Sequence, residues 1–193
     1  MTYMLLGLVL FFSAHGLQIV GRTRLLLLER MGRNLYTIVY SIVSLAGLAL
    51  IVFGFADYRS GGLIHVWFPP LWIRHMALLV NWFAIVFFVA AYLPCHIRRT
   101  LRHPMLTGIM ILAITHLLAN GDMGGMILFG TFLSWAVAAR ISIRFRAVYA
   151  NPVKASMLFD FLALAVGSVA YAIIVFWLHP HIFNIHVWPG IST

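Results

Sequence analysis

The chain has 193 residues, of which 63% are hydrophobic and only 9% are charged, and its mean hydropathy is +1.01. So little polar material cannot cover a water-soluble globule, and we therefore expect a polytopic membrane protein. The formal charge of +9 would favour nucleic-acid binding in a soluble protein. Here the charges lie between apolar segments, so no nucleic-acid partner is expected. Cys95 is the only cysteine, which excludes an intrachain disulfide and a cysteine metal cluster.

Six apolar segments approach the ~20 residues that a helix needs to cross a bilayer. They predict an all-α polytopic transmembrane helix bundle of about six helices, which forms a single integral membrane domain over residues 1–193. The first segment has no basic residues before its apolar run, so we interpret it as a membrane helix and not as a secretory signal. The segments lie at residues 2–20, 35–56, 70–93, 105–119, 124–140 and 156–178.

Basic residues alternate between the two sides of this predicted bundle. The loops 21–34, 94–104 and 140–155 hold 11 of the 13 Lys and Arg residues. Because loops rich in Lys and Arg stay in the cytoplasm, we expect these three loops to be cytoplasmic and both termini to be periplasmic. The expected location is the cell inner membrane, and membrane lipids are the first expected partners.

Several residues carry signals for helix ends and helix contacts. Asn34 is expected to cap the second segment, Pro104 to start the fourth and Ser156 to cap the sixth. In lipid, helices approach closely where they present small side chains. The second segment offers such a surface, made of Ser41, Ser44, Ala46, Gly47 and Gly54.

Two acidic residues lie near predicted helix ends. Asp122 is expected to cap the turn into the fifth segment, or alternatively to orient His75 or Arg74. Asp160 lies just inside the sixth segment, where we expect it to pair with an arginine of the preceding loop.

Two of the nine histidines lie deep in predicted spans. His15 is about five residues, roughly 8 Å, inside the cytoplasmic end of the first segment. His116 lies about 20 Å beyond His103 along the fourth helix. Thirteen steps of ~100° leave roughly 220° after full turns, so these last two histidines cannot face the same cavity. The faces of His15 and His116 are otherwise almost apolar, with Leu8, Phe11, Phe12 and Ile19 on the first and Met105, Ile109, Leu112 and Asn120 on the second.

An ionisable side chain inside a membrane is costly and is therefore a functional candidate. Two neutral imidazoles from different helices, enclosed by apolar walls, are what a six-coordinate haem b requires, so His15 and His116 are candidate metal ligands. The alternative is that each histidine only hydrogen-bonds the backbone of a neighbouring helix. Arg102, which could bind a propionate carboxylate or only set the topology, is a further candidate for cofactor binding, as are His103 and Asn120.

Four stretches of the chain together resemble the NnrU family of bacterial membrane proteins, which is named for a link to nitrite and nitric oxide reduction in denitrification. They are SAHGLQIVGRTRLLLLERMG, YSIVSLAGLALIVFG, RHPMLTGIMILAITHLLANGD and LFGTFLSWAV. The resemblance covers residues 1–150, and the run from Arg102 to Asp122 is its most specific part. The last apolar segment looks like a variable addition to this core.

That family is similar to the 15-cis-zeta-carotene isomerases of plants and cyanobacteria. Those are integral membrane proteins that carry haem b and isomerise a carotenoid double bond when the iron is reduced. The axial ligands proposed for them match His15 in AHG and His116 in ITHLL, so the resemblance implies the two ligands that depth indicates. The isomerases also have a cysteine three residues before the second histidine. This chain has Ala113 there, so ligand exchange through that thiol cannot occur.

Three classes of function remain open. The first is a haem-dependent cis-trans isomerase that acts on a lipophilic polyene dissolved in the bilayer. The second is a haem-based sensor or electron-transfer accessory protein of nitrite and nitric oxide metabolism, which would need a redox partner. The third is a membrane methyltransferase-like protein, because RHPMLTG, residues 102–108, also looks like part of the S-adenosylmethionine motif of isoprenylcysteine carboxyl methyltransferases. The paired glutamates of those enzymes are missing here, since residues 141–154 contain no carboxylate.

Overall fold

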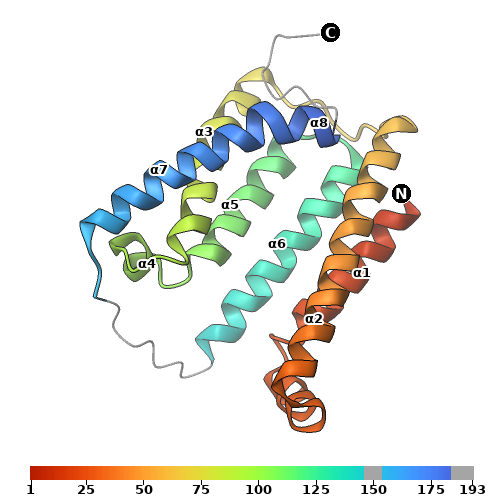
Figure 1. The fold of residues 1–193 in the computed structure, drawn as a ribbon. Coiled ribbons are helices and arrows are strands. Elements are labelled where there is room, and N and C mark those ends of the chain that lie inside the picture. The colour runs from red at the N-terminus through yellow and green to blue at the C-terminus, as the bar shows by residue number, and fades with distance from the viewer. Residues whose placement is uncertain (146–153, 184–193) are drawn as a thin grey trace. The chain divides into compact units, whose positions relative to one another are not determined.

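The structure is a computed structural model that describes residues 1–145 and 154–183. Within these residues every regular element is a helix (Figure 1), which confirms the all-α prediction. In chain order they are α1 (Thr2–Gly16), α2 (Gly21–Ser60), α3 (Leu71–Ala90), α4 (His96–Leu101), α5 (Pro104–Ala119), α6 (Met123–Arg144), α7 (Met157–Ile173), a π-helical segment (Ile174–Leu178) and α8 (His179–Phe183).

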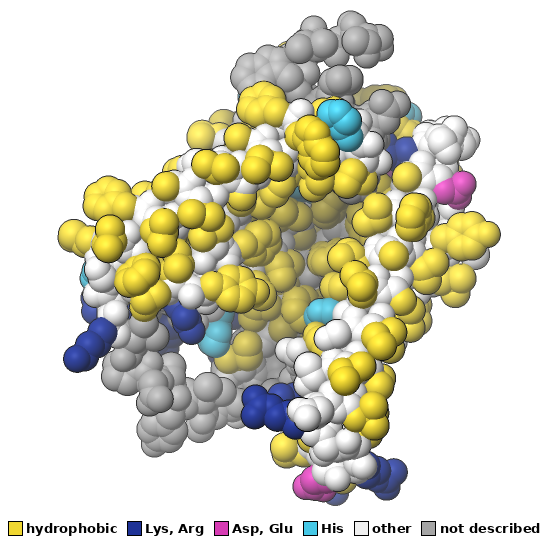
Figure 2. Space-filling view, viewed as in Figure 1, with side chains coloured by type: hydrophobic (Ala, Val, Ile, Leu, Met, Phe, Trp, Pro, Cys, Tyr) yellow, Lys and Arg dark blue, Asp and Glu magenta, His cyan; other side chains and the backbone are white. Residues whose placement is uncertain are grey.

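The apolar helices account for the six predicted spans. Four stretches, α2, α3, α6 and Met157–Ile182, are long and apolar enough to cross a membrane, and α1 and α5 are shorter apolar helices. The visible sides of α2 and α7 are mostly hydrophobic, and Lys and Arg lie towards the helix ends (Figure 2). The chain is therefore a multi-pass membrane protein.

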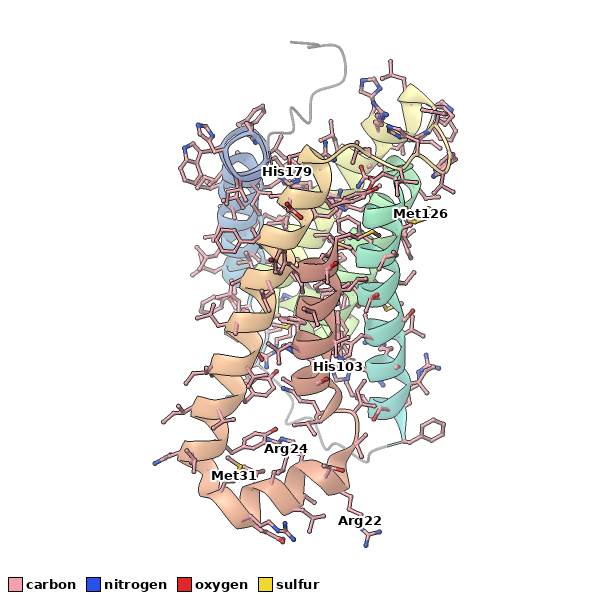
Figure 3. All side chains as sticks on the ribbon, turned by 90° about the vertical axis from the view of Figure 1, so that its right-hand side faces the viewer. Arg22, Arg24, Met31, His103, Met126 and His179 are labelled. Carbon is pink, nitrogen blue, oxygen red and sulfur yellow. The ribbon has the colours of Figure 1, made fainter. Side chains whose placement is uncertain are left out.

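The segment 21–34 is not the loop that its arginines predict. It forms the first part of α2, which bends at Gly32, where φ is 74° and ψ is 162°. Glycine adopts this region of backbone conformation readily because it has no Cβ. The run Leu25–Leu28, flanked by basic residues, suits a helix at a membrane surface. Figure 3 labels three residues of this first part, Arg22, Arg24 and Met31.

The predictions for Pro104 and Asp122 are confirmed, whereas Ser156 takes the cap position without a capping side chain and Asn34 caps no helix. Pro104 lies in the first turn of α5, and Ser156 precedes α7, although its side chain makes no capping hydrogen bond. Asp122 caps α6 by accepting the Gly125 N–H on Oδ1 at 2.7 Å. Asn34 lies inside α2, so the cap expected there is wrong: the helix continues through the bend instead of starting after it.

The chain forms two compact units. Unit 1 comprises Met1–Ile64 and Val137–Ala147, and so contains α1, α2 and the last part of α6. Unit 2 comprises His65–Ala136 and Val148–Thr193, and contains the first part of α6 and the other helices. The candidate ligand His15 therefore belongs to unit 1 and His116 to unit 2.

Glycines bring α1 and α2 of unit 1 into close contact (Figure 1). A Cβ added to Gly47 would lie 2.7 Å from the backbone nitrogen of Phe11. A Cβ added to Gly7 would lie 2.6 Å from the backbone nitrogen of Ile51. Backbone atoms cannot move aside as a flexible side chain can, so only glycine fits at these two positions.

The five small residues predicted for helix contact differ in burial, and Ser44 is partly buried. Gly47 and Gly54 are buried against α1, Gly54 on the backbone of Met4, as expected for helices that associate in lipid through van der Waals packing. Ser41 and Ala46 are exposed, because they project from other sides of α2.

In unit 2, α5 and α7 pack against α3. A Cβ added to Gly108 of α5 would lie 2.9 Å from the Ala84 carbonyl oxygen, and one added to Gly167 of α7 would lie 2.9 Å from Val86 Cα. Both contacts repeat the glycine packing of unit 1. They make α3 the central helix of this unit.

Polar side chains also join α3 to its two neighbours. Interhelical hydrogen bonds of this kind satisfy groups that lipid cannot solvate. They are Trp82 Nε1 to Ser168 Oγ (3.0 Å), the Tyr171 hydroxyl to the Leu78 carbonyl (2.6 Å) and Thr115 Oγ1 to Asn81 Oδ1 (2.5 Å).

The packing of unit 1 predicts that Gly47→Ala destabilises the protein, because the new Cβ meets the α1 backbone. Overpacking of this kind costs about 1–3 kcal/mol. The matched control is Gly130→Ala in α6, where an added Cβ meets nothing within 4 Å, and where the gain in helix propensity is about 0.5–1 kcal/mol. Thermal unfolding in one detergent compares the two. Equal unfolding temperatures would contradict the close α1–α2 contact.

Candidate functional site

His15 lies in the last turn of α1, because that helix ends at Gly16. The prediction that it lies several residues inside its span is wrong. The chain turns at once: the N–H groups of Gln18 and Ile19 bond to the carbonyls of His15 and Gly16 at 3.2 and 2.9 Å. The His15 imidazole is partly buried, so it remains a candidate ligand at the end of the helix.

The ring of His15 is fixed by its own helix. Its Nδ1 lies 2.8 Å from the carbonyl oxygen of Phe11. The ring stacks on the Phe11 side chain, with centroids 4.0 Å apart and planes 19° apart, and it meets Phe12 edge-on at 6.5 Å. These are two of the aromatic residues that the sequence places on the same face.

His116, in the last turn of α5, has a closely similar environment in unit 2. Its Nδ1 lies 2.7 Å from the carbonyl oxygen of Leu112. Its ring stacks on Phe129 of α6, with centroids 4.2 Å apart and planes 29° apart. The sequence interpretation did not identify Phe129, because its contact with His116 depends on how α5 and α6 meet after the turn.

The bonds to carbonyl oxygens determine the tautomer of both histidines. A carbonyl oxygen only accepts, so Nδ1 must carry the proton in each ring. Nε2 is then the unprotonated nitrogen that can bind a metal, and a backbone bond at the other nitrogen is the usual support of a metal-ligating histidine. The predicted alternative, a bond to a neighbouring helix, is replaced by a bond within the same helix.

A third histidine shows that this bonding pattern alone does not mark a ligand. The Nδ1 of His181 lies 2.6 Å from the Trp177 carbonyl oxygen, and its ring stacks on that tryptophan. His181 is nevertheless exposed, whereas His15 and His116 are partly buried. Burial therefore separates the two candidates from His181, but not from His179, which is also partly buried and whose Nδ1 lies 3.0 Å from the Ile174 carbonyl oxygen.

A polar corner lies beside His15 in unit 1, formed by Gln18, Tyr36 and Tyr40. The Tyr40 ring lies 5.4 Å from the imidazole of His15, and its hydroxyl accepts a hydrogen bond from Gln18 Nε2 at 2.9 Å. Tyr36 stacks on Tyr40 with centroids 6.2 Å apart. The sequence interpretation missed this corner. Its only signal is the spacing of the two tyrosines, which places them on one helix face.

The other candidates for cofactor binding lie at two ends of α5. Arg102 is exposed, has a φ of 60° and ends α4. His103 is the residue before α5, and its carbonyl accepts the N–H of Thr107 at 3.1 Å. Asn120 ends the same helix, and its N–H bonds to the carbonyl of His116 at 2.9 Å. The length of α5 therefore separates Arg102 and His103 from His116, while Asn120 remains next to it.

The partner of Asp160 differs from the one predicted. Asp160 Oδ2 lies 2.6 Å from Nδ1 of His96, and Oδ1 accepts the N–H of Ile97 at 3.0 Å. The expected partner was an arginine of the loop before α7, but residues 95–97 approach the start of α7 from α4 instead. Sequence periodicity could not show this contact, because 64 residues separate His96 from Asp160.

Cysteine chemistry has no evident part in this arrangement. Sγ of Cys95 caps α4 by accepting the N–H of Arg98 at 3.4 Å. Ala113, at the position where the isomerases have a cysteine, is fully buried. Among residues 1–145 and 154–183, no group of three or more His, Cys, Asp or Glu could hold a metal ion. A haem iron, by contrast, needs at most two protein ligands.

Comparison with known proteins establishes the family. A family model described as NnrU protein matches residues 3–187. The chain belongs to the NnrU family. No curated protein and no solved structure matches it. The NnrU match continues past residue 150, where the sequence resemblance ends, and includes α7.

The His96–Asp160 contact of this NnrU protein predicts that Asp160→Asn lowers stability by about 1 kcal/mol, because a charge-assisted hydrogen bond between α4 and α7 is lost. Asn can still accept the Ile97 N–H. The matched control is Asp57→Asn, whose side chain is 62% exposed and lies 3.5 Å from the N-terminal amine. Such a surface pair contributes little. Denaturant titration in detergent should separate the two variants, and equal midpoints would contradict the assigned role of Asp160.

Proposed function

We propose that this NnrU-family membrane protein binds haem b, with His15 and His116 as the iron ligands. The observation that carries the proposal is that both imidazoles are partly buried, stack on a phenylalanine and are tied to their own backbone through Nδ1, which makes Nε2 the ligating nitrogen. Phe11 and Phe129 stack on the two rings and would restrict access of water. The donor set therefore fits the haem group.

The activity we propose is redox-dependent cis-trans isomerisation of a lipophilic polyene. When bound, haem supplies a reducible iron that can polarise a double bond. The two ligand helices, α1 and α5, contain no Asp, Glu, Lys or Arg, so they offer an apolar surface to a substrate and no carboxylate for acid-base catalysis. A substrate dissolved in the bilayer would reach such helices laterally. An electron donor, whose identity is open, is the implied redox partner.

A second candidate is electron transfer or sensing linked to nitrite and nitric oxide metabolism. The feature that favours it is the matching tautomer of the two histidines, because His15 and His116 would then hold the iron through two nitrogen ligands and the haem would supply a one-electron redox centre. Nitric oxide could then bind only after one ligand had left. Electron carriage needs no open position.

The proposed orientation follows the basic loops. We place residues 21–34, 94–104 and 140–155 on the cytoplasmic side of the inner membrane and the termini in the periplasm. The first part of α2 would then lie at the cytoplasmic surface. In this orientation α1 runs inward and α5 runs outward.

These helix directions set a condition on the ligand pair. His15 and His116 each lie in the last turn of their helices, so in the proposed orientation the end of α1 faces the cytoplasmic side and the end of α5 faces the periplasmic side. A single haem held by both therefore requires these two short helices to end at the same depth in the bilayer. Spectra of single variants test this condition directly, because each missing ligand changes the spin state of the iron.

We expect His15→Ala and His116→Ala each to abolish the low-spin haem spectrum, because the iron loses one nitrogen ligand. Haem content and spin state are measured by absorption and electron paramagnetic resonance after purification in mild detergent. A full low-spin spectrum in either variant would reject that ligand.

Two control variants accompany this measurement. His181→Ala removes an exposed imidazole with the same backbone bond and should leave the spectrum unchanged. His103→Ala should reduce haem content at most partially, because His103 lies at the opposite end of α5 from His116. Complete loss of haem in His103→Ala would mean that the wrong face of this helix has been chosen.

The isomerase proposal predicts a reaction in reduced, haem-loaded protein. A linear carotenoid with a cis double bond, added in detergent, should change its isomer composition over many turnovers, as measured by chromatography. Oxidised protein is the control and should leave the composition unchanged. No change with the reduced protein would contradict isomerisation and favour the electron-transfer candidate.

A further inference from the structure

Three buried polar groups of unit 1 have no hydrogen-bond partner among the described residues: Ser44 Oγ, the hydroxyl of Tyr36 and Nη1 of Arg140. The last two are the donors on which the inference rests. The Tyr36 side chain is a core residue with 9% exposure. A buried polar group without a partner is strongly unfavourable, and more so where lipid replaces water. Donors left in this state in a folded protein therefore point to a ligand that accepts from them.

Both donors belong to the end of unit 1 that contains His15. Tyr36 stacks on Tyr40, and Tyr40 accepts from Gln18 in the connection between α1 and α2. Ser142, two residues beyond Arg140, donates to the carbonyl of Ile19 in the same connection at 3.2 Å. The end of α6 that carries Arg140 is thus held against the chain segment that follows His15.

The chemistry of the two donors specifies the ligand group. A guanidinium can only donate and favours an anionic acceptor, above all a carboxylate, and a phenol hydroxyl can donate its proton to the same group. Haem b carries two propionate carboxylates. Because His15 is a proposed iron ligand in the same unit, a carboxylate of the bound haem would reach this part of the protein.

We propose that Tyr36 and Arg140 bind a propionate of the haem, with the Tyr36 hydroxyl and the Arg140 guanidinium donating to its carboxylate oxygens. The inference rests on the proposed haem function and adds the site that orients the porphyrin. It replaces Arg102, the arginine favoured by sequence position, with an arginine whose Nη1 is buried. Tyr36 and Arg140 are binding residues and take no part in the redox chemistry.

The test compares two porphyrins that differ only in this carboxylate chemistry, haem b and its dimethyl ester. Each is titrated into the apoprotein in detergent, with binding followed by the Soret band. Wild-type protein should bind haem b about 10-fold or more tightly than the ester, which is the size expected for a charge-assisted contact. Tyr36→Phe and Arg140→Gln should each lose most of this preference.

The affinity for the ester serves as the internal measure of folding, because the ester keeps only a neutral carbonyl acceptor and carries no charge for the Arg140 guanidinium to pair with. Matched controls are Tyr171→Phe, whose hydroxyl already bonds to the Leu78 carbonyl, and Arg144→Gln, whose side chain is exposed. Both should keep the wild-type preference for haem b.

The outcomes separate this inference from the haem proposal. Equal affinity of wild-type protein for the two porphyrins would overturn the carboxylate site and leave haem binding standing. An undiminished preference in Tyr36→Phe or in Arg140→Gln would overturn it as well, and for tyrosine would indicate a buried water as the acceptor. Failure of wild-type protein to bind either porphyrin would contradict the haem proposal itself.

Discussion

The interior of a bilayer offers no hydrogen bonds, and the rest of the structure depends on this constraint. Several polar side chains of the apolar helices meet it by bonding to their own backbone one turn earlier, as Ser13 does to Val9 and Thr131 to Ile127. Others, such as Trp82 with Ser168, meet it across a helix contact. A buried donor without a hydrogen-bond partner is especially unfavourable in such a medium, so the presence of one suggests that a ligand accepts from it.

The same constraint connects packing to the candidate site. Close glycine contacts bring α1 against α2, and α5 against α3, because lipid-embedded helices gain stability from van der Waals contact and not from the exclusion of water. That packing holds the two helices whose ends carry His15 and His116. In both, the backbone bond that satisfies Nδ1 also defines Nε2 as the nitrogen for a metal. The need to satisfy Nδ1 in a medium without water therefore fixes the imidazole ring and at the same time leaves Nε2 unprotonated, as a metal ligand must be.

The sequence predicts much of this fold but less of the site. Apolar length alone identifies the six spans, and the turn chemistry of Pro104 and Asp122 is local enough to be predicted. The helical start of α2 was missed because a count of arginines cannot distinguish a loop from a helix at the membrane surface. The pairing of His96 with Asp160 and the corner around Tyr36 were missed because both depend on contacts between distant segments, which periodicity does not encode. The early end of α1 depends on the tight turn after His15.

The most direct measurement is the absorption spectrum of the wild-type protein, produced with haem supplied, purified in mild detergent, and recorded oxidised and after reduction with dithionite. The account predicts about one haem per chain, with a sharp Soret band and the narrow reduced bands of low-spin iron with two nitrogen ligands. A protein that stays colourless after haem addition would contradict the account, and binding of S-adenosylmethionine would then be the next property to measure.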